Sequence, residues 1–288
     1  MTISGFTFVK NGVLLEYPFL ESIRSILPIC YEVVIAVGKS DDDTKEKILA
    51  LNEPKIRIID TVWDPAIRSG GQILAQQTNI ALDHITGDWG FYIQADEVVH
   101  EKFLPIIKQA AEQYVNDSKV EGLLFAFRHF YGSYDYVGLS RDWYRHEIRM
   151  IRNRPSIRSY KDAQGFRSEK GRKLNVTAIP AEMYHYGWVR SPHAQQKKKV
   201  LVSPLWHDDE WMKENVDDND KFRYNRREWL EEFKGTHPKV MEPRIQEMNW
   251  KFPYNPTKVL IPFKERLSFW IERNMGIRIG EYKNYKII

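Results

Sequence analysis

Short apolar runs alternate with helical patterns over roughly the first 95 residues of the chain. Parallel neighbouring strands need a long crossover connection, and that crossover is usually a helix. The runs are apolar at successive positions, which is typical of strands covered on both faces. We therefore expect an α/β fold with a Rossmann-like, mostly parallel sheet flanked by helices. The expected strands are 5–9, 32–37, 55–60 and 90–94, and the expected helices are 16–27, 43–51 and 71–85.

The rest of the chain is less regular, and no repeat or low-complexity linker divides it. A length of 288 residues allows one large domain with an extension. We expect a domain over residues 1–200, made of the halves 1–119 and 120–200, and a helical C-terminal extension over 201–288. The expected elements here are helices at 102–115, 206–215 and 224–233 and strands at 122–128, 148–151 and 178–186.

Charge and aromatic residues are distributed unevenly. Residues 1–119 hold 11 basic and 17 acidic side chains, a net charge of −6, while the remainder carries a net charge of +10 and 27 of the 38 aromatic residues. The basic residues are interleaved with acidic ones and do not form one dense stripe, so we expect no nucleic-acid binding. Any function proposed for this chain must explain why residues 1–119 are acidic and why the remainder is basic and rich in aromatic residues.

The single cysteine, Cys30, excludes an internal disulfide and a zinc site built on cysteines. The N-terminal segment lacks the basic region and apolar stretch of a signal peptide. No run of about 18 apolar residues predicts a membrane-spanning helix. We therefore expect a cytoplasmic protein.

Two adjacent acids, Asp96 and Glu97, directly follow the expected strand 90–94. Ligands of such sheets bind at the carboxyl ends of the strands. Paired carboxylates there repel each other unless a cation or another partner offsets them, and Mg²⁺ or Mn²⁺ bound by a carboxylate and by diphosphate oxygens would do so. The alternative is that one of the two acids caps the following helix.

A second acidic cluster, Asp41 to Asp43, follows the strand 32–37. Its polar groups could receive a ribose or a base edge, or Asp43 could cap the next helix with Glu46 completing a capping box. Gly70 and Gly71 precede a helix and could bring backbone N–H groups close to a phosphate, although a plain turn explains them equally.

The order of these segments resembles family 2 glycosyltransferases, which have the GT-A fold. Ser40, Asp42 and Thr44 match the family's S-T-D-G-T loop, and Ala95, Asp96 and Glu97 match the end of its D-A-D-E form of the D-x-D motif. The resemblance covers residues 3–105 well and extends more loosely to about 190. It implies a nucleotide-sugar half over 1–119 and an acceptor half over 120–200.

The resemblance implies a divalent metal, Mn²⁺ or Mg²⁺, at Asp96 and nucleotide contacts at Lys10, Asp42 and Gln94. The chain departs from the family pattern at two places. Gln94 replaces the first acid of D-x-D, and Val37 and Gly38 replace the family's aspartates before the S-T-D-G-T loop.

For the acceptor half, the resemblance implies a carboxylate base that removes a proton from the acceptor hydroxyl. Asp162 follows the run 149–153, RMIRN, which is similar to the R-L-F-R-N run that precedes this acid in relatives. Asp162 is the first candidate for the base and Glu147 the second. The alternative is that Asp162 is a surface residue in a loop that contains glycine.

The resemblance also implies a histidine that completes the metal site. His185 ends an expected strand and could bind Mn²⁺, and Arg190 could hold a phosphate through its planar fork. A histidine between aromatic residues could equally be packed in the core, and His193 is the alternative ligand.

Aromatic and basic residues of the second part suggest how an acceptor is held. Tyr and Trp rings stack on sugar faces. Residues 251–288 carry a net charge of +5, and an amphipathic helix at 264–275 has Leu267, Trp270 and Met275 on one face, flanked by Lys264 and Arg273. Such a helix can contact the inner face of the membrane peripherally. It could equally dock on the domain or on a second subunit of a homodimer.

These observations favour an inverting, metal-dependent glycosyltransferase of cell-surface polysaccharide or lipopolysaccharide synthesis. Its donor would be a UDP- or GDP-linked sugar and its acceptor a glycan or a lipid-linked glycan; inversion follows from the resemblance. One alternative is a sugar-phosphate nucleotidyltransferase, although residues 10–12 form a poor version of the loop it needs. The other is a catalytically silent nucleotide- or glycan-binding protein, suggested by Gln94.

Overall fold

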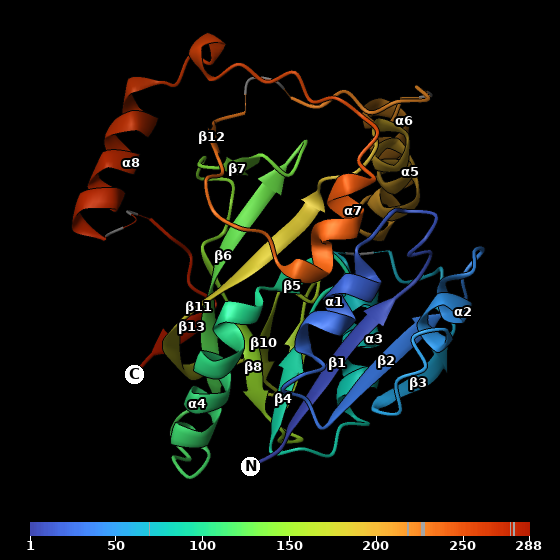
Figure 1. Ribbon diagram of the computed structural model, residues 1–288, viewed down its shortest axis with the longest axis vertical. Helices are drawn as coiled ribbons and strands as arrows, with labels where there is room; N and C mark the ends of the chain where they lie inside the picture. Colours follow the sequence, from blue (N-terminus) through green and yellow to red (C-terminus); the bar gives the residue numbers. More distant parts are fainter. Residues whose placement is uncertain (69, 218, 226–227, 277, 279) are drawn as a thin grey trace.

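A computed structural model describes residues 1–68, 70–217, 219–225, 228–276, 278 and 280–288 (Figure 1). The alternating pattern of the first part forms parallel strands joined by helices, as predicted. Strand β1 lies between β2 and β4, and β3 pairs with β2, all in parallel. The elements are β1 (Ile3–Val9), α1 (Phe19–Ile26), β2 (Glu32–Gly38), α2 (Thr44–Leu49), β3 (Ile56–Thr61), α3 (Gln72–Leu82) and β4 (Trp89–Tyr92).

Antiparallel strands extend this sheet. Strand β8 (His146–Arg152) pairs with β4 and β6 (Gly122–Tyr131), giving the order β12-β7-β6-β8-β4-β1-β2-β3. The long strand β11 (Leu174–Trp188) pairs with β6 in parallel and with β5 (Glu97–Val99). Helix α4 (Leu104–Tyr114) connects β5 to β6. The predicted fold class, an α/β sheet flanked by helices, is confirmed.

Helices cover both faces of the sheet, which explains the continuous apolar strands. Val33 and Ile35 of β2 belong to the apolar cluster that contains Ile23 of α1. Val34 and Ala36 point to the other face and belong to the cluster formed with α3. Successive side chains of a strand point to opposite faces, so the apolar residues of β2 alternate between the two helix layers.

The C-terminal part contributes both helices and strands (Figure 1). Strand β12 pairs with β7 (Tyr136–Gly138), and β13 pairs with β11. The helix predicted at 224–233 is wrong over residues 230–232, which form β12; residues 226–227 lie outside the described residues. The boundary expected at residue 200 falls inside α5. The elements are α5 (Pro192–Val202), α6 (Asp209–Asn215), β12 (Leu230–Glu232), α7 (Glu242–Gln246), α8 (Phe263–Met275) and β13 (Tyr285–Ile287).

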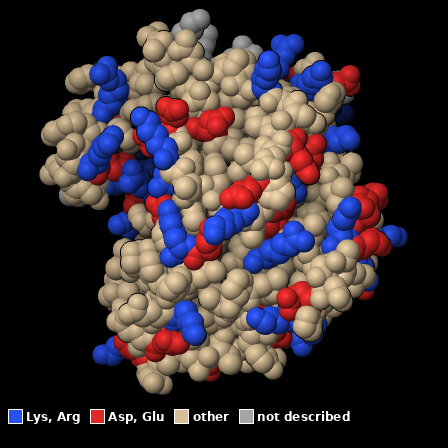
Figure 2. Space-filling model, viewed as in Figure 1, with Lys and Arg blue, Asp and Glu red and all other residues tan. Residues whose placement is uncertain are grey.

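Helix α8 lies at the edge of the molecule, away from the parallel strands (Figure 1). Figure 2 shows acidic and basic side chains intermingled over this face, with Lys and Arg gathered around α8. Within the part of the chain that the structure describes, no helix has both the length and the apolar character needed to cross a bilayer.

Candidate active site

A cavity of about 620 Å³ lies at the carboxyl ends of the parallel strands. Ligands of open α/β sheets bind at this edge. Each strand of the parallel half contributes residues that follow it, and α5 with the turn after it closes the opposite side. The wall-forming residues discussed below are Phe8, Lys10, Asp41, Trp63, Gln94, Asp96, Tyr144, Asp162, Gln164, His185 and Lys198.

Asp96 is a buried carboxylate that faces two basic side chains. Its Oδ1 lies 3.8 Å from Nε2 of His185, and its Oδ2 lies 3.5 Å from Nζ of Lys198. Burial alone would raise the pKa of Asp96, but the nearby charges of Lys198 and Arg190 hold it below its ordinary value. Asp96 is therefore a buried anion at the wall of the cavity.

Lys198 is the basic residue of this site that the sequence analysis missed. Ser191 caps α5 through its hydroxyl, which accepts from the Ala194 N–H at 3.2 Å, and Pro192 begins the helix. This start turns Lys198 inward, where Nζ also donates to the Gly187 carbonyl at 3.1 Å. Burial and the charge of Arg190 lower its pKa to about 8. Only the fold reveals its nearness to Asp96.

His185 is oriented by a second histidine. Nδ1 of His129 lies 2.9 Å from Nδ1 of His185, and Nε2 of His129 lies 2.7 Å from the Tyr144 carbonyl oxygen. Burial keeps the pKa of His129 well below its ordinary value, so the ring is neutral. A carbonyl only accepts, so Nε2 of His129 donates to it and Nδ1 accepts from Nδ1–H of His185. Burial also lowers the pKa of His185, so its ring is neutral and its Nε2 lone pair faces Asp96.

The Asp96 and His185 pair fits a divalent cation. A carboxylate oxygen and a neutral imidazole nitrogen are suitable ligands for Mn²⁺, and their 3.8 Å separation lets one ion contact both. No group of three or more potential ligands from His, Cys, Asp or Glu occurs among the described residues. Mg²⁺ and Mn²⁺ sites often use one or two protein ligands, with substrate phosphates and water completing the shell. The chain therefore offers a partial site that a diphosphate would complete.

Glu97, the other acid of the pair, has a structural partner. Arg149 of β8 donates to both carboxylate oxygens at 2.8 and 2.7 Å, and both side chains are fully buried. Glu97 also accepts from the backbone N–H of Gln94 at 3.1 Å. The repulsion expected between adjacent acids is thus relieved by an arginine for Glu97, which leaves Asp96 as the acid in the cavity.

Lys10 and Gln94, two expected nucleotide contacts, line the cavity. The Gln94 amide donates to the Ala163 carbonyl at 3.2 Å, which links the end of β4 to the loop after β9 (Ile157–Tyr160). Nζ of Lys10 lies 5.4 Å from the centre of the Trp63 ring. Both residues can therefore reach a ligand in this space.

Trp63 explains one departure from the family pattern. Its ring packs beside Phe8, with centroids 5.9 Å apart, and a Cβ at Gly38 would lie 2.6 Å from its Nε1. A side chain larger than glycine at position 38 would collide with this ring. Gly38 therefore leaves the space that the Trp63 ring needs at this wall of the cavity.

Asp42 does not line this cavity, contrary to the expected nucleotide contact. Its Oδ2 accepts from the Leu14 N–H at 2.6 Å, and Oδ1 accepts from the Thr44 N–H at 3.0 Å. The carboxylate joins two loops and caps α2, the role expected for Asp43. Asp41 lines the cavity instead and accepts from the Asn11 amide at 3.2 Å.

Arg190, the expected phosphate ligand, is buried away from the cavity. Its guanidinium donates to the carbonyls of Leu15 and Gly187 at 2.9 and 3.0 Å and lies 4.6 Å from the Tyr17 ring centre. Arg190 therefore affects the site through its charge. Lys198, which lines the cavity, is instead placed to reach a diphosphate.

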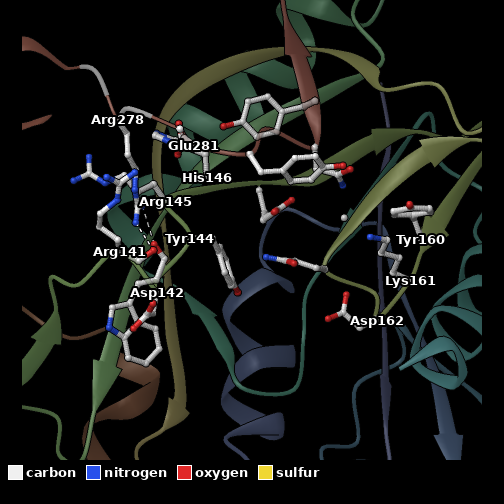
Figure 3. A pocket seen from close by; sticks show the side chains of 18 residues that line it. Arg141, Asp142, Tyr144, Arg145, His146, Tyr160, Lys161, Asp162, Arg278 and Glu281 are labelled. Carbon is white, nitrogen blue, oxygen red and sulfur yellow. Dashed lines mark hydrogen bonds between the residues drawn. The ribbon is translucent and has the colours of Figure 1, made fainter. Parts of the chain in front are cut away.

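Asp162 lies where this cavity meets a second cavity of about 370 Å³, and it lines both. It sits between Lys161 and Ala163, whose φ angles of 54° and 62° are in the left-handed region. Such backbone is unfavourable for residues other than glycine and often marks functional turns. Figure 3 shows Asp162 at one side of this second cavity. Glu147, the second candidate base, lines the second cavity and not the first.

No family model matches the chain, and no curated protein matches it. Among solved structures, the chain is similar to S. aureus TarS, with a TM-score of 0.40 and 14% identity over 76% of this chain and 41% of TarS. It is also similar to glucosyl-3-phosphoglycerate synthase from Mycobacterium tuberculosis in complex with Mn²⁺, UDP and phosphoglyceric acid. That similarity has a TM-score of 0.31 and 22% identity, over 45% of this chain and 43% of the synthase. The aligned part is less than half of either of these proteins.

Proposed function

We propose that the chain is a glycosyltransferase that moves a sugar from a nucleotide diphosphate to a hydroxyl of a glycan or lipid-linked acceptor. One observation carries the proposal. Asp96 faces His185 and Lys198 in a 620 Å³ cavity at the carboxyl ends of parallel strands, and Asp162 joins this cavity to a second one. The first cavity suits a donor, and the second suits an acceptor.

The donor is a UDP- or GDP-linked sugar bound through its base, ribose and diphosphate. Trp63 and Phe8 offer aromatic surface to the base, and Lys10 and Gln94 offer donors to the ribose or the phosphate. Lys198 donates to the diphosphate by a charge-assisted hydrogen bond. Asp41 takes the role first assigned to Asp42.

Asp96 and His185 would hold Mn²⁺ or Mg²⁺ beside the diphosphate. A bound ion would supply positive charge to offset the charge that develops on the leaving diphosphate. His129 keeps the His185 lone pair turned toward Asp96. Lys198 adds a second positive charge beside the leaving group.

Asp162 acts as the base of the transfer. As the acceptor oxygen attacks the anomeric carbon, its proton passes to the Asp162 carboxylate, and the bond from that carbon to the diphosphate oxygen breaks. Attack from the second cavity, on the side opposite to the leaving group, inverts the configuration of the sugar.

Hydrolysis of UDP- and GDP-sugars in the presence of Mn²⁺ tests this function. We expect slow release of UDP or GDP by the unaltered chain and none by Asp96→Ala. Asp162→Asn should bind the nucleotide but lose transfer to an acceptor. Nucleotide binding without any turnover would favour the silent binding protein, and release of inorganic diphosphate from a nucleoside triphosphate and a sugar phosphate would favour the nucleotidyltransferase.

Helix α8 is proposed to place this enzyme peripherally on the inner face of a membrane, where a lipid-linked acceptor for cell-surface polysaccharide synthesis would be reached. Phe263, Leu267 and Trp270 occupy one face of the helix and are 79%, 46% and 59% exposed. Arg266 and Arg273 flank this face and favour anionic lipid. Co-sedimentation with phosphatidylglycerol vesicles but not with phosphatidylcholine vesicles is expected. Loss of vesicle binding in Trp270→Glu supports the contact, whereas a concentration-dependent dimer abolished by this change would contradict it.

A further inference from the structure

The second cavity is built from three segments that are distant in the sequence. It lies between residues 141–147, the turn at 160–165 and the C-terminal residues 278 and 280–285 (Figure 3). Its volume of about 370 Å³ is at the lower end of the range for small-molecule sites. Asp162 lines this cavity and the donor cavity, so a ligand in the second cavity can place one group beside Asp162.

The charged side chains of this cavity compensate one another. Arg145 forms an ion pair with Glu272 of α8, Arg141 donates to the Ser268 hydroxyl at 2.8 Å, and Arg278 donates to two backbone carbonyls at 2.9 and 2.6 Å. Among the described residues, the basic side chains that line the cavity are matched in charge by its acids together with Glu272: Arg141, Arg145, Lys161 and Arg278 against Asp142, Asp162 and Glu281. Burying a charge without a partner is costly, so this balanced cavity favours an uncharged ligand.

Glu147 is a buried wall residue of this cavity that is largely uncharged at neutral pH. It is 5% exposed, and burial raises the pKa of its carboxyl group to about 8. Its Oε2 has no hydrogen-bond partner among the described residues. A buried polar atom without a partner is costly, and a protonated carboxyl group can both donate and accept. A hydroxyl group of a ligand would supply the missing hydrogen bond.

Two more neutral polar groups line the cavity beside Glu147. The side-chain oxygen of Asn284 accepts from Nε of Arg167 at 2.6 Å, which leaves the Asn284 NH₂ group as a donor for a ligand. A Cβ at Gly165 would collide with this NH₂ group and lie 2.9 Å from Oε2 of Glu147, so the two groups converge beside Gly165. Burial raises the pKa of Tyr285, whose hydroxyl therefore keeps its proton and can donate.

Aromatic rings form further parts of the wall. Tyr144 and Tyr160 come from opposite sides of the cavity (Figure 3), and Tyr282 of the C-terminal segment lines it with 71% of its surface exposed. Aromatic rings offer apolar surface to the faces of a sugar, and neutral donors and acceptors suit its hydroxyl groups. The cavity therefore combines the two kinds of contact that a sugar needs.

We propose that this cavity binds an uncharged sugar as the acceptor, with its other hydroxyl groups at Glu147, Asn284 and Tyr285 and its reactive hydroxyl at Asp162. The inference rests on the proposed glycosyl transfer and adds the chemical class of its acceptor. A protonated Glu147 cannot take up the proton of the acceptor, so Asp162 remains the base.

Saturation-transfer NMR titration with simple sugars tests the proposal. The uncharged probes are the methyl glycosides of glucose, galactose and N-acetylglucosamine, and their charged counterparts are the methyl glycosides of glucuronic acid, galacturonic acid and glucosamine. We expect at least one uncharged probe to bind about tenfold or more tightly than its charged counterpart.

Substitutions at Glu147 test its contact with the sugar. Glu147→Leu should weaken binding of the uncharged probe about tenfold, because a donor and acceptor is lost. Glu147→Gln should retain the binding, because its amide is uncharged and can both donate and accept. Asn116→Leu, which changes an exposed residue after α4, is the control and should leave the binding unchanged.

Tyr285→Phe, which removes only a hydroxyl group, is a second variant in case Glu147→Leu does not fold, as judged by its circular dichroism melt. It should weaken the same binding about threefold or more. Absence of binding by every uncharged probe, equal binding of the charged counterparts, or unchanged binding in both folded variants would overturn the proposal. The same samples are titrated with UDP-glucose and GDP-glucose in Mn²⁺. Donor binding without a preference for uncharged sugars contradicts the acceptor class alone, whereas failure to bind any donor contradicts the proposed function itself.

Discussion

The Nδ1 atoms of His129 and His185 lie 2.9 Å apart, and this contact connects the Tyr144 carbonyl to the site of Asp96. Because the Tyr144 carbonyl only accepts and burial lowers the pKa of His185, the neutral His185 ring donates through Nδ1 and has no proton on its outer nitrogen. Metal-binding histidines are commonly fixed in this way by a second group that accepts from the other ring nitrogen.

His129→Phe should weaken Mn²⁺ binding by about 10- to 100-fold in the presence of UDP, because His185 loses the acceptor that fixes its tautomer. The measurement is the electron paramagnetic resonance signal of free Mn²⁺ during titration. His84→Gln, which changes an exposed histidine, is the control. Unchanged Mn²⁺ affinity in a folded His129→Phe protein would show that the relay has no part in binding.

Lys198→Met should change two affinities in opposite directions. Mn²⁺ alone should bind Asp96 more tightly, because the ammonium 3.5 Å from its carboxylate is gone. UDP or GDP should bind about tenfold more weakly, since a charge-assisted bond to the diphosphate is lost. The exposed neighbour Lys197→Met is the matched control in both titrations. A weaker affinity for Mn²⁺ alone would contradict this account of Lys198.

Trp63→Ala should weaken the binding free energy of the nucleotide by about 1–3 kcal/mol, which is the usual contribution of a base stacked on an aromatic ring. Trp63→Phe should retain most of the affinity because it keeps a stacking surface. Fluorescence or calorimetric titration of UDP and GDP measures both changes, with the exposed Tyr31→Ala as control. Equal losses in the Ala and Phe variants would indicate that the indole has another role.

Glu147 should make the protein less stable as the pH rises. Its carboxyl group ionises near the ordinary pKa of 4.5 when unfolded but near 8 when folded. The stability from its protonated form is therefore complete below about pH 4.5 and is lost progressively up to about pH 8. The free energy of unfolding of the unaltered chain should fall by a few kcal/mol over this window, since a pKa difference of one unit corresponds to about 1.4 kcal/mol. Glu147→Gln should not show this decrease.

Urea unfolding at pH 5 and pH 8 measures this effect, with the exposed Glu112→Gln as control. The difference between the two pH values should be smaller in Glu147→Gln than in the unaltered chain and unchanged in Glu112→Gln. An equal pH dependence in all three proteins would mean that Glu147 is already ionised in the folded state.

Arg149→Met should destabilise the fold by about 3–5 kcal/mol, because it leaves the fully buried Glu97 carboxylate without its partner. The double variant Glu97→Met with Arg149→Met should recover part of this loss, since it buries no unpaired charge. Urea unfolding of the three proteins measures both effects. A double variant less stable than Arg149→Met would contradict this explanation.

Local patterns predicted the parallel half of the fold because its central strands β1, β2 and β4 are buried on both faces and each crossover has its own helical pattern. The prediction was wrong at residues 230–232, where the charged stretch forms a strand because β7 offers a free edge. Pairing with a distant strand leaves little trace in local periodicity.

The order of the motifs in the sequence pointed to five residues that all line one cavity: Lys10, Gln94, Asp96, Asp162 and His185. Asp42 and Arg190 lie outside it because backbone groups of neighbouring loops use their charged ends. The roles of His129, Lys198 and Trp63 depend on contacts between distant segments. The Lys197 to Lys199 run after a capped helix start was the only sequence signal for Lys198, and it does not tell which lysine points inward.

Calorimetric titration of UDP and GDP in Mn²⁺ tests the central claim most directly. The account predicts that at least one nucleotide binds, that Asp96→Asn weakens this binding about tenfold or more, and that Asp43→Asn, which changes an exposed acid outside the cavity, leaves it unchanged. Absence of nucleotide binding, or binding that Asp96→Asn does not affect, would contradict a nucleotide-sugar site at the end of β4.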